Sequence, residues 1–254
     1  MTTGNLESPG AGAPVQPPKK NVFARIAGVL FSPAETFDDI ARRPDIIGPL
    51  LIILAIGYVT TFLVMPHLDF EALAMQQAEA MRKQNPNMGE GDVERVASMT
   101  KTWGRAMGFV GPVLGVFWYL IVAAVLLGAS RAMGGAGDFK QALSTTLYAW
   151  MPLVLYGIIV TVIVMAKGMV DPSQMATVVK SNPAFLTDMK EQPILFSLLS
   201  SFDIFTIWTI ILMIFGFSAF SKFSRTKSAA IVVSLWLVII VVKLGFAALA
   251  ASRA

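Results

Sequence analysis

Residues 228–252 have the sequence SAAIVVSLWLVIIVVKLGFAALAAS, in which Lys243 is the only charged residue. A helix needs about 20 apolar residues to cross a hydrocarbon core about 30 Å thick. Four further stretches meet this length, and their only charged residue is Asp203. The predicted spans are, approximately, residues 46–66, 106–130, 141–166, 194–220 and 228–251. The sequence therefore predicts an all-α fold, a polytopic transmembrane helix bundle with five spans.

The composition of the whole chain agrees with a membrane protein. Of its 254 residues, 55% are hydrophobic and 14% are charged, whereas about 25% of the residues of a soluble globular domain are charged. Once the five spans and their connections are subtracted, too few residues remain for a soluble domain of ordinary size. Residues 46–254 are therefore predicted to form one transmembrane domain.

Few reactive side chains are present. The chain has no Cys and one His, His67, which lies at the mouth of the first span. A serine–histidine intramembrane protease needs a histidine deep in a span, an aspartyl intramembrane protease needs two facing acids, and a zinc site needs several His or Cys ligands. The spans offer a single acid. We therefore expect no enzyme, no metal site, no cofactor and no nucleic-acid partner.

The distribution of Lys and Arg predicts the orientation. The two short loops, residues 131–140 and 222–227, together carry five basic residues. If the N-terminus is cytoplasmic and the spans alternate, the cytoplasmic segments hold ten basic and six acidic residues, and the outer segments hold nine of each. Because cytoplasmic loops are enriched in Lys and Arg, we expect the N-terminus in the cytoplasm and the C-terminus outside.

Two regions precede the first span. Residues 1–20 form a polar tract rich in Pro, Gly and Ala, a composition typical of a disordered tail. Residues 21–45 have apolar side chains at helical spacing and are predicted to form two short helices. Ser32 and Glu35 are predicted to form a capping box at the start of the second helix. These helices either lie on the cytoplasmic leaflet as interfacial helices or pack against the inner end of the bundle.

The two outer loops are predicted to be helical. In the loop between the first two spans, Asp69 is placed to cap a helix, and Asn85-Pro86-Asn87 is placed to end it. A second helix that starts near Asp92 leads to the second span, so we expect a helical hairpin. The loop before the fourth span is shorter, and it is broken at Pro172, Pro183 and Pro193.

Asp203 and Lys243 are the two charges within the spans. Counted from the inner ends of spans four and five, both lie in the outer half of the membrane, about 24 Å and about 21 Å along their helices. An unpaired charge inside a span costs roughly 2.5–3.5 kcal/mol on insertion scales, so such charges usually pair or face water. We therefore predict an interhelical ion pair. It either fixes the rotation of the last two helices or serves as a proton or ion relay in a cavity; in a third reading, Lys243 extends alone to the outer interface.

Four glycines in the region of the second span have spacings of four, three and four. They are Gly104, Gly108, Gly111 and Gly115. Small residues at such spacings allow helix backbones in a membrane to approach closely. The pattern favours tight helix packing within the bundle over homodimerisation.

Two segments resemble the Yip1 domain family of five-span membrane proteins. The first is Ser32-Pro33-Ala34-Glu35-Thr36-Phe37, followed by Pro44-Asp45-Ile46-Ile47-Gly48-Pro49-Leu50. The second is Gly134-Gly135-Ala136-Gly137-Asp138-Phe139-Lys140-Gln141-Ala142, which continues to Tyr148-Ala149-Trp150-Met151-Pro152. Within these segments, the residues that we assign to the family motif are Asp45, Gly48, Pro49, Tyr148 and Pro152.

The resemblance implies a fold, an orientation and a location. The family has five spans, a cytoplasmic N-terminus and an outer C-terminus, and its bacterial branch implies the bacterial cytoplasmic (inner) membrane. Eukaryotic members are linked to vesicle traffic and small GTPases. In this chain Ile47 stands where eukaryotic members commonly have Tyr, and the short loops are of the bacterial kind. No small GTPase partner is therefore expected.

The sequence favours a non-enzymatic membrane-organising or scaffold component. Its expected partners are the lipid bilayer and other membrane proteins or a second copy of itself. The alternative is a small permease or ion-coupled carrier that uses Asp203 and Lys243. A carrier is expected to have more polar residues at mid-membrane or interrupted spans in paired halves. No internal repeat is visible in the sequence, which favours the scaffold.

Overall fold

Five helical segments of the computed structural model are long and apolar enough to cross a membrane. They are Ile47–His67, Glu90–Ala132, Phe139–Lys167, Ile204–Ser221 and Arg225–Ala251. The structure describes residues 20–85, 87, 89–189 and 191–252. The predicted tail therefore lies outside the described residues, except for Lys20. The prediction of an all-α bundle with five spans is confirmed.

The elements follow one another with short connections. In chain order they are α1 (Val22–Phe31), α2 (Pro33–Arg42), α3 (Ile47–Val64), η1 (Met65–His67), α4 (Phe70–Gln84), α5 (Glu90–Ala132), α6 (Phe139–Ala149), α7 (Met151–Lys167), η2 (Pro172–Thr177), η3 (Pro183–Leu186), α8 (Pro193–Leu199), α9 (Ile204–Ser221) and α10 (Arg225–Ala251). The second predicted span, residues 106–130, is only the later part of α5, because this helix already begins at Glu90.

Two of the predicted spans are divided. The third consists of α6 and α7, which meet at Trp150, and Pro152 lies in the first turn of α7. The fourth begins at Ile204 rather than near residue 194, because Asp203 caps α9 and the preceding residues form the separate helix α8. Both divisions lie within long, mainly apolar stretches, and the caps and prolines decide where each helix begins.

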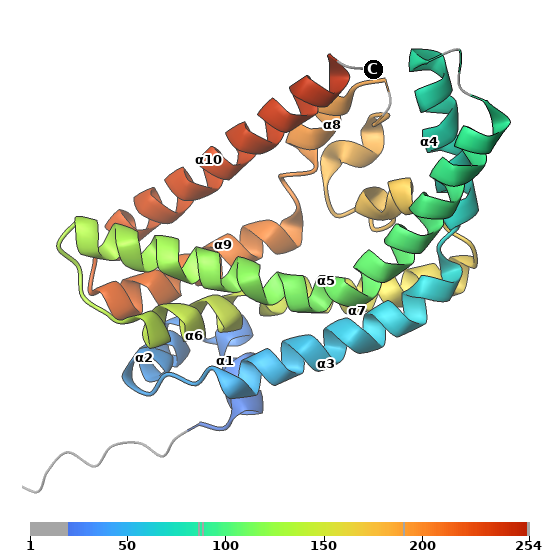
Figure 1. The fold of residues 1–254 in the computed structure, drawn as a ribbon. Helices are drawn as coiled ribbons and strands as arrows, with labels where there is room; N and C mark the ends of the chain where they lie inside the picture. Colours follow the sequence, from blue (N-terminus) through green and yellow to red (C-terminus); the bar gives the residue numbers. More distant parts are fainter. Residues whose placement is uncertain (1–19, 86, 88, 190, 253–254) are drawn as a thin grey trace, which may run out of the picture.

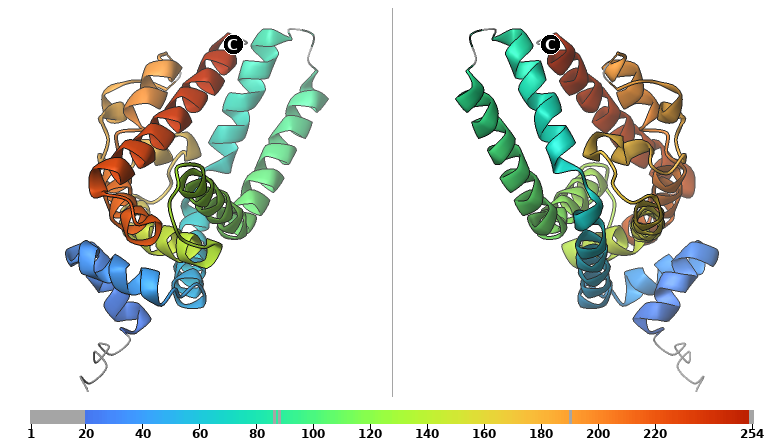
Figure 2. Two further views of the ribbon diagram at one scale, coloured as in Figure 1. Left: turned by 90° about the vertical axis from the view of Figure 1, so that its left-hand side faces the viewer. Right: turned by 90° about the vertical axis from the view of Figure 1, so that its right-hand side faces the viewer.

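The spans lie close together at one end of the bundle and diverge toward the other (Figure 1). We call the first the near end, defined by α1, α2 and the turns at residues 133–138 and 222–224. At the far end, α4 and the beginning of α5 form one arm (Figure 2). The helix α8 and the last turns of α10 form a second arm, and Figure 1 shows the ends of the two arms apart. The helices are therefore packed together at the near end, whereas the tips of the two arms stand apart at the far end.

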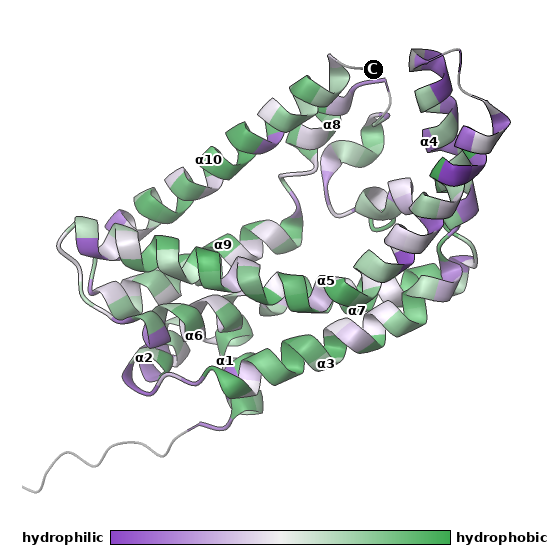
Figure 3. Ribbon diagram, in the orientation of Figure 1, coloured by the Kyte–Doolittle hydropathy of each residue, from purple (hydrophilic) through white to green (hydrophobic). Residues whose placement is uncertain are grey.

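The predicted hairpin in the first outer loop is present. Asp69 Oδ1 accepts a hydrogen bond from the N–H of Ala72 at 2.9 Å, which caps α4 as expected. The chain reverses after α4, and α5 returns alongside it. Lys101 Nζ of α5 lies 3.0 Å from Glu71 Oε1 of α4. Figure 3 shows that hydrophilic residues gather on this hairpin, whereas the spans are mainly hydrophobic.

The two outer loops are bonded to each other. Leu68 and Val170 form an isolated parallel bridge. The N–H of Val170 donates to the carbonyl of His67 at 2.8 Å, and the N–H of Asp69 donates to the carbonyl of Val170 at 2.9 Å. The start of the hairpin is thereby fixed to the loop that follows α7.

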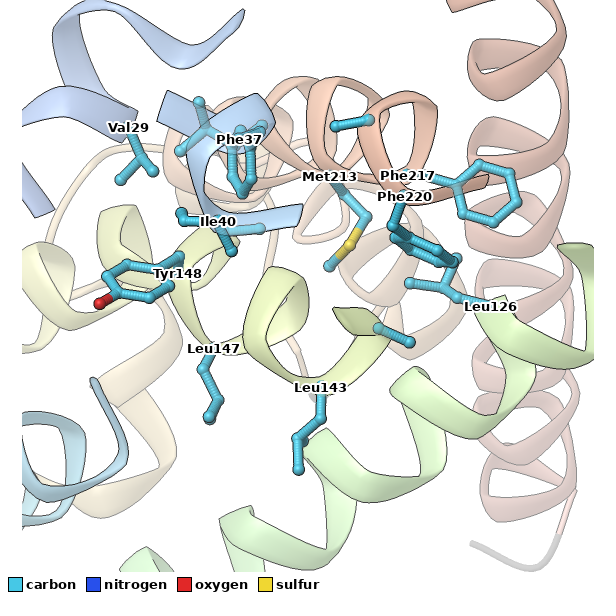
Figure 4. Close-up of a cluster of buried hydrophobic side chains, with 14 of the residues drawn as sticks. Val29, Phe37, Ile40, Leu126, Leu143, Leu147, Tyr148, Met213, Phe217 and Phe220 are labelled. Carbon is cyan, nitrogen blue, oxygen red and sulfur yellow. The ribbon is translucent and has the colours of Figure 1, made fainter. Parts of the chain in front are cut away.

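The helix α2 packs against the near end. Phe37 and Ile40 have no exposed surface, and Figure 4 shows them beside Tyr148 of α6 and Met213 of α9. These side chains belong to the largest buried apolar cluster of the described residues. For α2 the structure therefore agrees with the second alternative, packing against the inner end of the bundle.

The predicted capping box at the start of α2 is wrong. The N–H of Ser32 donates to the carbonyl of Gly28 at 2.7 Å, as the last bond of α1, and the Ser32 side chain caps no N–H. Glu35 pairs instead with Lys20, with 2.8 Å between Oε1 and Nζ. Because a single residue separates the two helices, the N–H of Ser32 is already bonded and Glu35 has no donor to reach.

Candidate functional site

A buried ion pair joins the first two helices. Arg25 of α1 has no exposed surface, and its Nη2 lies 2.9 Å from Oδ2 of Asp39 on α2. Its Nε donates to the same oxygen at 3.0 Å. This pair is not among the contacts predicted from the sequence. The signal was present, because Arg25 is the only charge within residues 22–31, just as Lys243 is the only charge in the last span.

The segment before α3 is hydrogen-bonded to α6. The Ser144 hydroxyl donates to the carbonyl of Asp45 at 2.9 Å and accepts from its N–H at 3.1 Å. The Tyr148 hydroxyl donates to Asp45 Oδ2 at 3.4 Å. The N–H of Gly48 donates to Oδ1 of the same side chain at 3.3 Å. The structure thus brings together three of the motif residues, Asp45, Gly48 and Tyr148.

The other motif features shape the backbone around this cluster. A Cβ at position 48 would lie 2.9 Å from Cγ2 of Val22, so glycine allows α1 to approach the start of α3. Pro49 and Pro152 are buried in the first turns of α3 and α7. Proline fits a first turn because the N–H that it lacks has no intrahelical partner there. The motif residues attach the short helices to the first and third spans.

The contact between Asp45 and Tyr148 therefore unites the two segments that carry the family resemblance. The family model of the Yip1 domain matches residues 27–246. The chain belongs to the Yip1 family. Its Yip1 domain begins within α1, contains both outer loops and ends within α10.

A relative of this Yip1 protein is the membrane protein YknW of Bacillus subtilis (strain 168). The two are 28% identical over 182 residues, and the alignment covers 70% of this chain and 70% of the relative. No solved structure matches the chain. Family and relative together identify this Yip1 protein as an integral membrane protein.

Asp203 caps the fourth spanning helix. Its Oδ1 accepts from the N–H groups of Phe205 at 2.9 Å and Thr206 at 3.3 Å. Its Oδ2 accepts from the Ser181 hydroxyl and from Nδ2 of Asn182. The side chain is buried. Both carboxylate oxygens are therefore bonded to α9 and to the loop between η2 and η3.

The expected ion pair between Asp203 and Lys243 is not formed. Lys243 Nζ donates to the hydroxyls of Ser200 at 2.7 Å and Ser201 at 3.1 Å. The two charges thus reach the same break between α8 and α9. Asp203 turns toward the start of α9, because the free N–H groups and the dipole of a helix N-terminus favour an anion.

The four glycines of α5 divide into two groups. A Cβ at Gly104 would lie 2.6 Å from the Phe70 ring, and one at Gly108 would overlap the Met65 side chain. These two glycines admit neighbouring side chains of the same molecule. A Cβ at Gly111 would meet nothing within 4 Å, and one at Gly115 would reach only a hydroxyl at 4.0 Å. The second pair faces open space.

That open space belongs to a groove of about 460 Å³ between α3, α5 and α7. Each helix contributes glycine backbone to its wall, from Gly57, Gly111, Gly115 and Gly157. No charged residue lines the groove. The hydroxyl of Thr60, one of its few polar groups, donates to the carbonyl of Gly57 at 2.9 Å. The groove therefore suits an apolar side chain or a hydrocarbon chain and not a charged solute.

The polar clusters offer no ligand set for a metal ion. Within the part of the chain that the structure describes, no three His, Asp or Glu side chains gather at one place. Arg25 with Asp39, and Ser144 with Asp45, are buried or partly buried polar contacts at the near end that join one helix or segment to another, which suits them to hold helices together. Among the features described above, the groove alone presents empty space at the depth of the spans.

Proposed function

We propose that this Yip1 protein is a non-enzymatic membrane scaffold that receives an apolar segment of another membrane protein in the groove between α3, α5 and α7. The groove is the observation that carries the proposal. We further propose that the protein lies in the bacterial cytoplasmic membrane with its N-terminus in the cytoplasm and its C-terminus outside. Its partners are then the bilayer and a membrane protein or a second copy of itself, with no role for a small GTPase.

The walls of the groove favour a helical partner. In lipid, helices gain little from the hydrophobic effect and associate by close packing at small residues. Gly57, Gly111 and Gly157 offer such positions on three helices, of which α3 packs on both α5 and α7. Large side chains of a partner helix can fill the space that glycine leaves, while the partner backbone rests on the rim.

A photo-cross-linking experiment tests the scaffold. A cross-linking amino acid is placed at Ile56, inside the groove, and in a second variant at Val238, on the exposed face of α10. The expected result is a discrete membrane-protein adduct from position 56 and none from position 238. Adducts of the same pattern at both positions would contradict the proposal.

Filling the groove provides the matched comparison. Gly111→Leu occupies the groove, whereas Gly128→Leu places the same side chain on the same helix where a Cβ also meets nothing within 4 Å. We expect Gly111→Leu to abolish the adduct from position 56 and Gly128→Leu to preserve it. The mass of the adduct distinguishes a second copy from another protein. Size-exclusion chromatography in detergent verifies that both variants are folded.

A carrier is the second candidate, and one observation favours it. The chain is broken between α8 and α9, and Lys243 binds the serines of that break. Broken helices commonly form the ion and substrate sites of transporters. Flux measured in liposomes separates the two functions. If a substrate-dependent flux is found and Asp203→Asn abolishes it, the scaffold proposal is rejected in favour of the carrier.

A further inference from the structure

The helix α1 exposes apolar side chains and buries its charged one, which is the reverse of an amphipathic helix in water. Its single charged residue, Arg25, is fully buried, while Phe23 is 71% exposed and Phe31 is 82% exposed. Ala27 is exposed as well. Residues 23, 27 and 31 are four apart, so they lie on one face of the helix. The structure therefore presents two aromatic rings to the surroundings and hides the guanidinium.

This orientation is held by specific contacts. Arg25 is fixed by Asp39, and Val29, on the same side of α1, has no exposed surface. Rotating α1 to hide the phenylalanines would expose Val29 and separate Arg25 from Asp39. A helix that sits in water gains from burying its aromatic rings and solvating its charge. Burying Arg25 while exposing the two phenylalanines is favourable only where the outer face of α1 meets an apolar medium.

The exposed face of α1 continues the lipid-facing surface of the first span. Val22 packs where Gly48 leaves space at the start of α3. On α3, Ile47 and Leu51 are exposed, as expected for side chains that meet lipid. Exposed apolar side chains are therefore present both on α1 and on the beginning of α3, which pack against each other. Figure 3 shows α1 as a mainly hydrophobic helix beside the beginning of α3.

We propose that the outer face of α1 lies in the lipid interface of the near-end leaflet, with Phe23, Ala27 and Phe31 at the boundary of headgroups and acyl chains. Interfacial helices bind lipid through a buried apolar face and are strengthened by basic residues at anionic headgroups. Exposed Arg42 at the end of α2 supplies such a charge. Thus α2 packs against the protein, whereas α1 contacts the protein on one side and lipid on the other. This inference does not depend on the groove.

Spin labels on single cysteines test the proposal in the full-length protein. The chain contains no Cys, so each label is placed with no background substitution. Four variants carry the label, Phe23→Cys, Ala27→Cys, Phe31→Cys and the control Asp38→Cys on the exposed side of α2. The protein is reconstituted in vesicles of phosphatidylethanolamine and phosphatidylglycerol. Collision rates with O₂, which concentrates in lipid, and with a water-soluble nickel chelate are then measured.

The expected result is that labels at 23, 27 and 31 collide more with O₂ than with the nickel chelate, and that the label at 38 shows the reverse. Nickel accessibility at 23, 27 and 31 equal to that at 38 would place the face in water and overturn the proposal. Low accessibility to both agents, with broadening between labels on different molecules, would show a second copy and also overturn it. Ala27→Cys removes no aromatic ring. If the phenylalanine variants fail to fold, the label at position 27 therefore tests the proposal by itself.

Discussion

Arg25, Asp203 and Lys243 each interrupt an apolar stretch, and each is bound by polar groups from another part of the chain. Asp39 pairs with Arg25, and serine hydroxyls bind Asp203 and Lys243. Removing one partner of a buried ion pair leaves the other charge without compensation, which costs more than the intact pair contributes. The contribution of each charge to stability therefore depends on its own local partners.

The pair of Arg25 and Asp39 is expected to be required for stability. Arg25→Met leaves the buried carboxylate of Asp39 without its partner, and we expect a loss of about 3–5 kcal/mol in the free energy of unfolding. The double variant Arg25→Met/Asp39→Leu is expected to recover most of this loss, because both charges are then gone. Unfolding in detergent, followed by circular dichroism, measures both.

An exposed ion pair close to the same two helices is the control. Lys20, which lies just before α1, forms an ion pair with Glu35 of α2, but both side chains reach solvent. Lys20→Met is expected to change the free energy of unfolding by less than about 1 kcal/mol. Equal losses for Lys20→Met and Arg25→Met would contradict the role given to burial.

Asp203 and Lys243 are expected to act independently. Because each has its own hydroxyl partners, the losses caused by Asp203→Ala and Lys243→Ala should add in the double variant to within about 0.5 kcal/mol. A double-mutant cycle on unfolding free energies measures the coupling. A coupling above about 1 kcal/mol would indicate that the two charges do attract each other in the membrane.

The helices show where sequence reasoning succeeds. Long stretches with at most one charge have few alternatives to a membrane span, so the spans formed by α3 and α10 follow directly from composition. The break between α8 and α9 does not, because a few polar residues within a long apolar stretch do not by themselves end a helix. It depends on Ser181, which reaches Asp203 from a loop twenty-two residues away. The partner of Arg25 was equally hidden, since no pattern specifies which acid of α2 faces α1.

The glycines of α5 show the same limit at the level of one element. Their spacing predicted close packing, and Gly104 and Gly108 do admit side chains of the same molecule. The spacing does not reveal that Gly111 and Gly115 face a groove. That depends on how α3 and α7 are placed around α5, which is a property of the assembled bundle.

Two alanine substitutions distinguish the two groups of glycines. In Gly104→Ala the new methyl group meets the nearly buried ring of Phe70, so we expect a loss of about 1 kcal/mol in stability. In Gly111→Ala it meets empty space, and alanine favours a helix over glycine by up to about 1 kcal/mol. Thermal unfolding of both variants in one detergent measures the difference. Equal melting temperatures would contradict the packing described for Gly104.

For the whole molecule, the near end joins most of the chain. The turn at residues 133–138 is bonded to the end of α9 through the N–H of Ala136 and the carbonyl of Ser221. Lys227 Nζ, at the start of α10, donates to the carbonyl of Met133 at 3.2 Å. The charge asymmetry seen in the sequence therefore belongs to one physical surface, where the basic residues of both short loops gather. That surface is the one we place in the cytoplasm.

The orientation is testable because the chain lacks cysteine. Glu79→Cys lies on the exposed face of the hairpin, and Asp38→Cys lies at the near end. In bacterial spheroplasts, a membrane-impermeant maleimide is expected to label Glu79→Cys directly and Asp38→Cys only after the membrane is opened. The reverse pattern would show that the near end faces outward, against the charge rule.

A proline lies within α5, the long helix that contains the second span. α5 is continuous over 43 residues and contains Pro112, which cannot donate to the carbonyl of Gly108 and so weakens the helix at that turn. The same turn lines the groove. From Pro112 to Glu90 the helix measures about 33 Å, so a change of about 10° at the proline would displace the tip of the hairpin by about 6 Å. The turn of α5 that lies against the groove is therefore also the turn at which the direction of the polar hairpin is set.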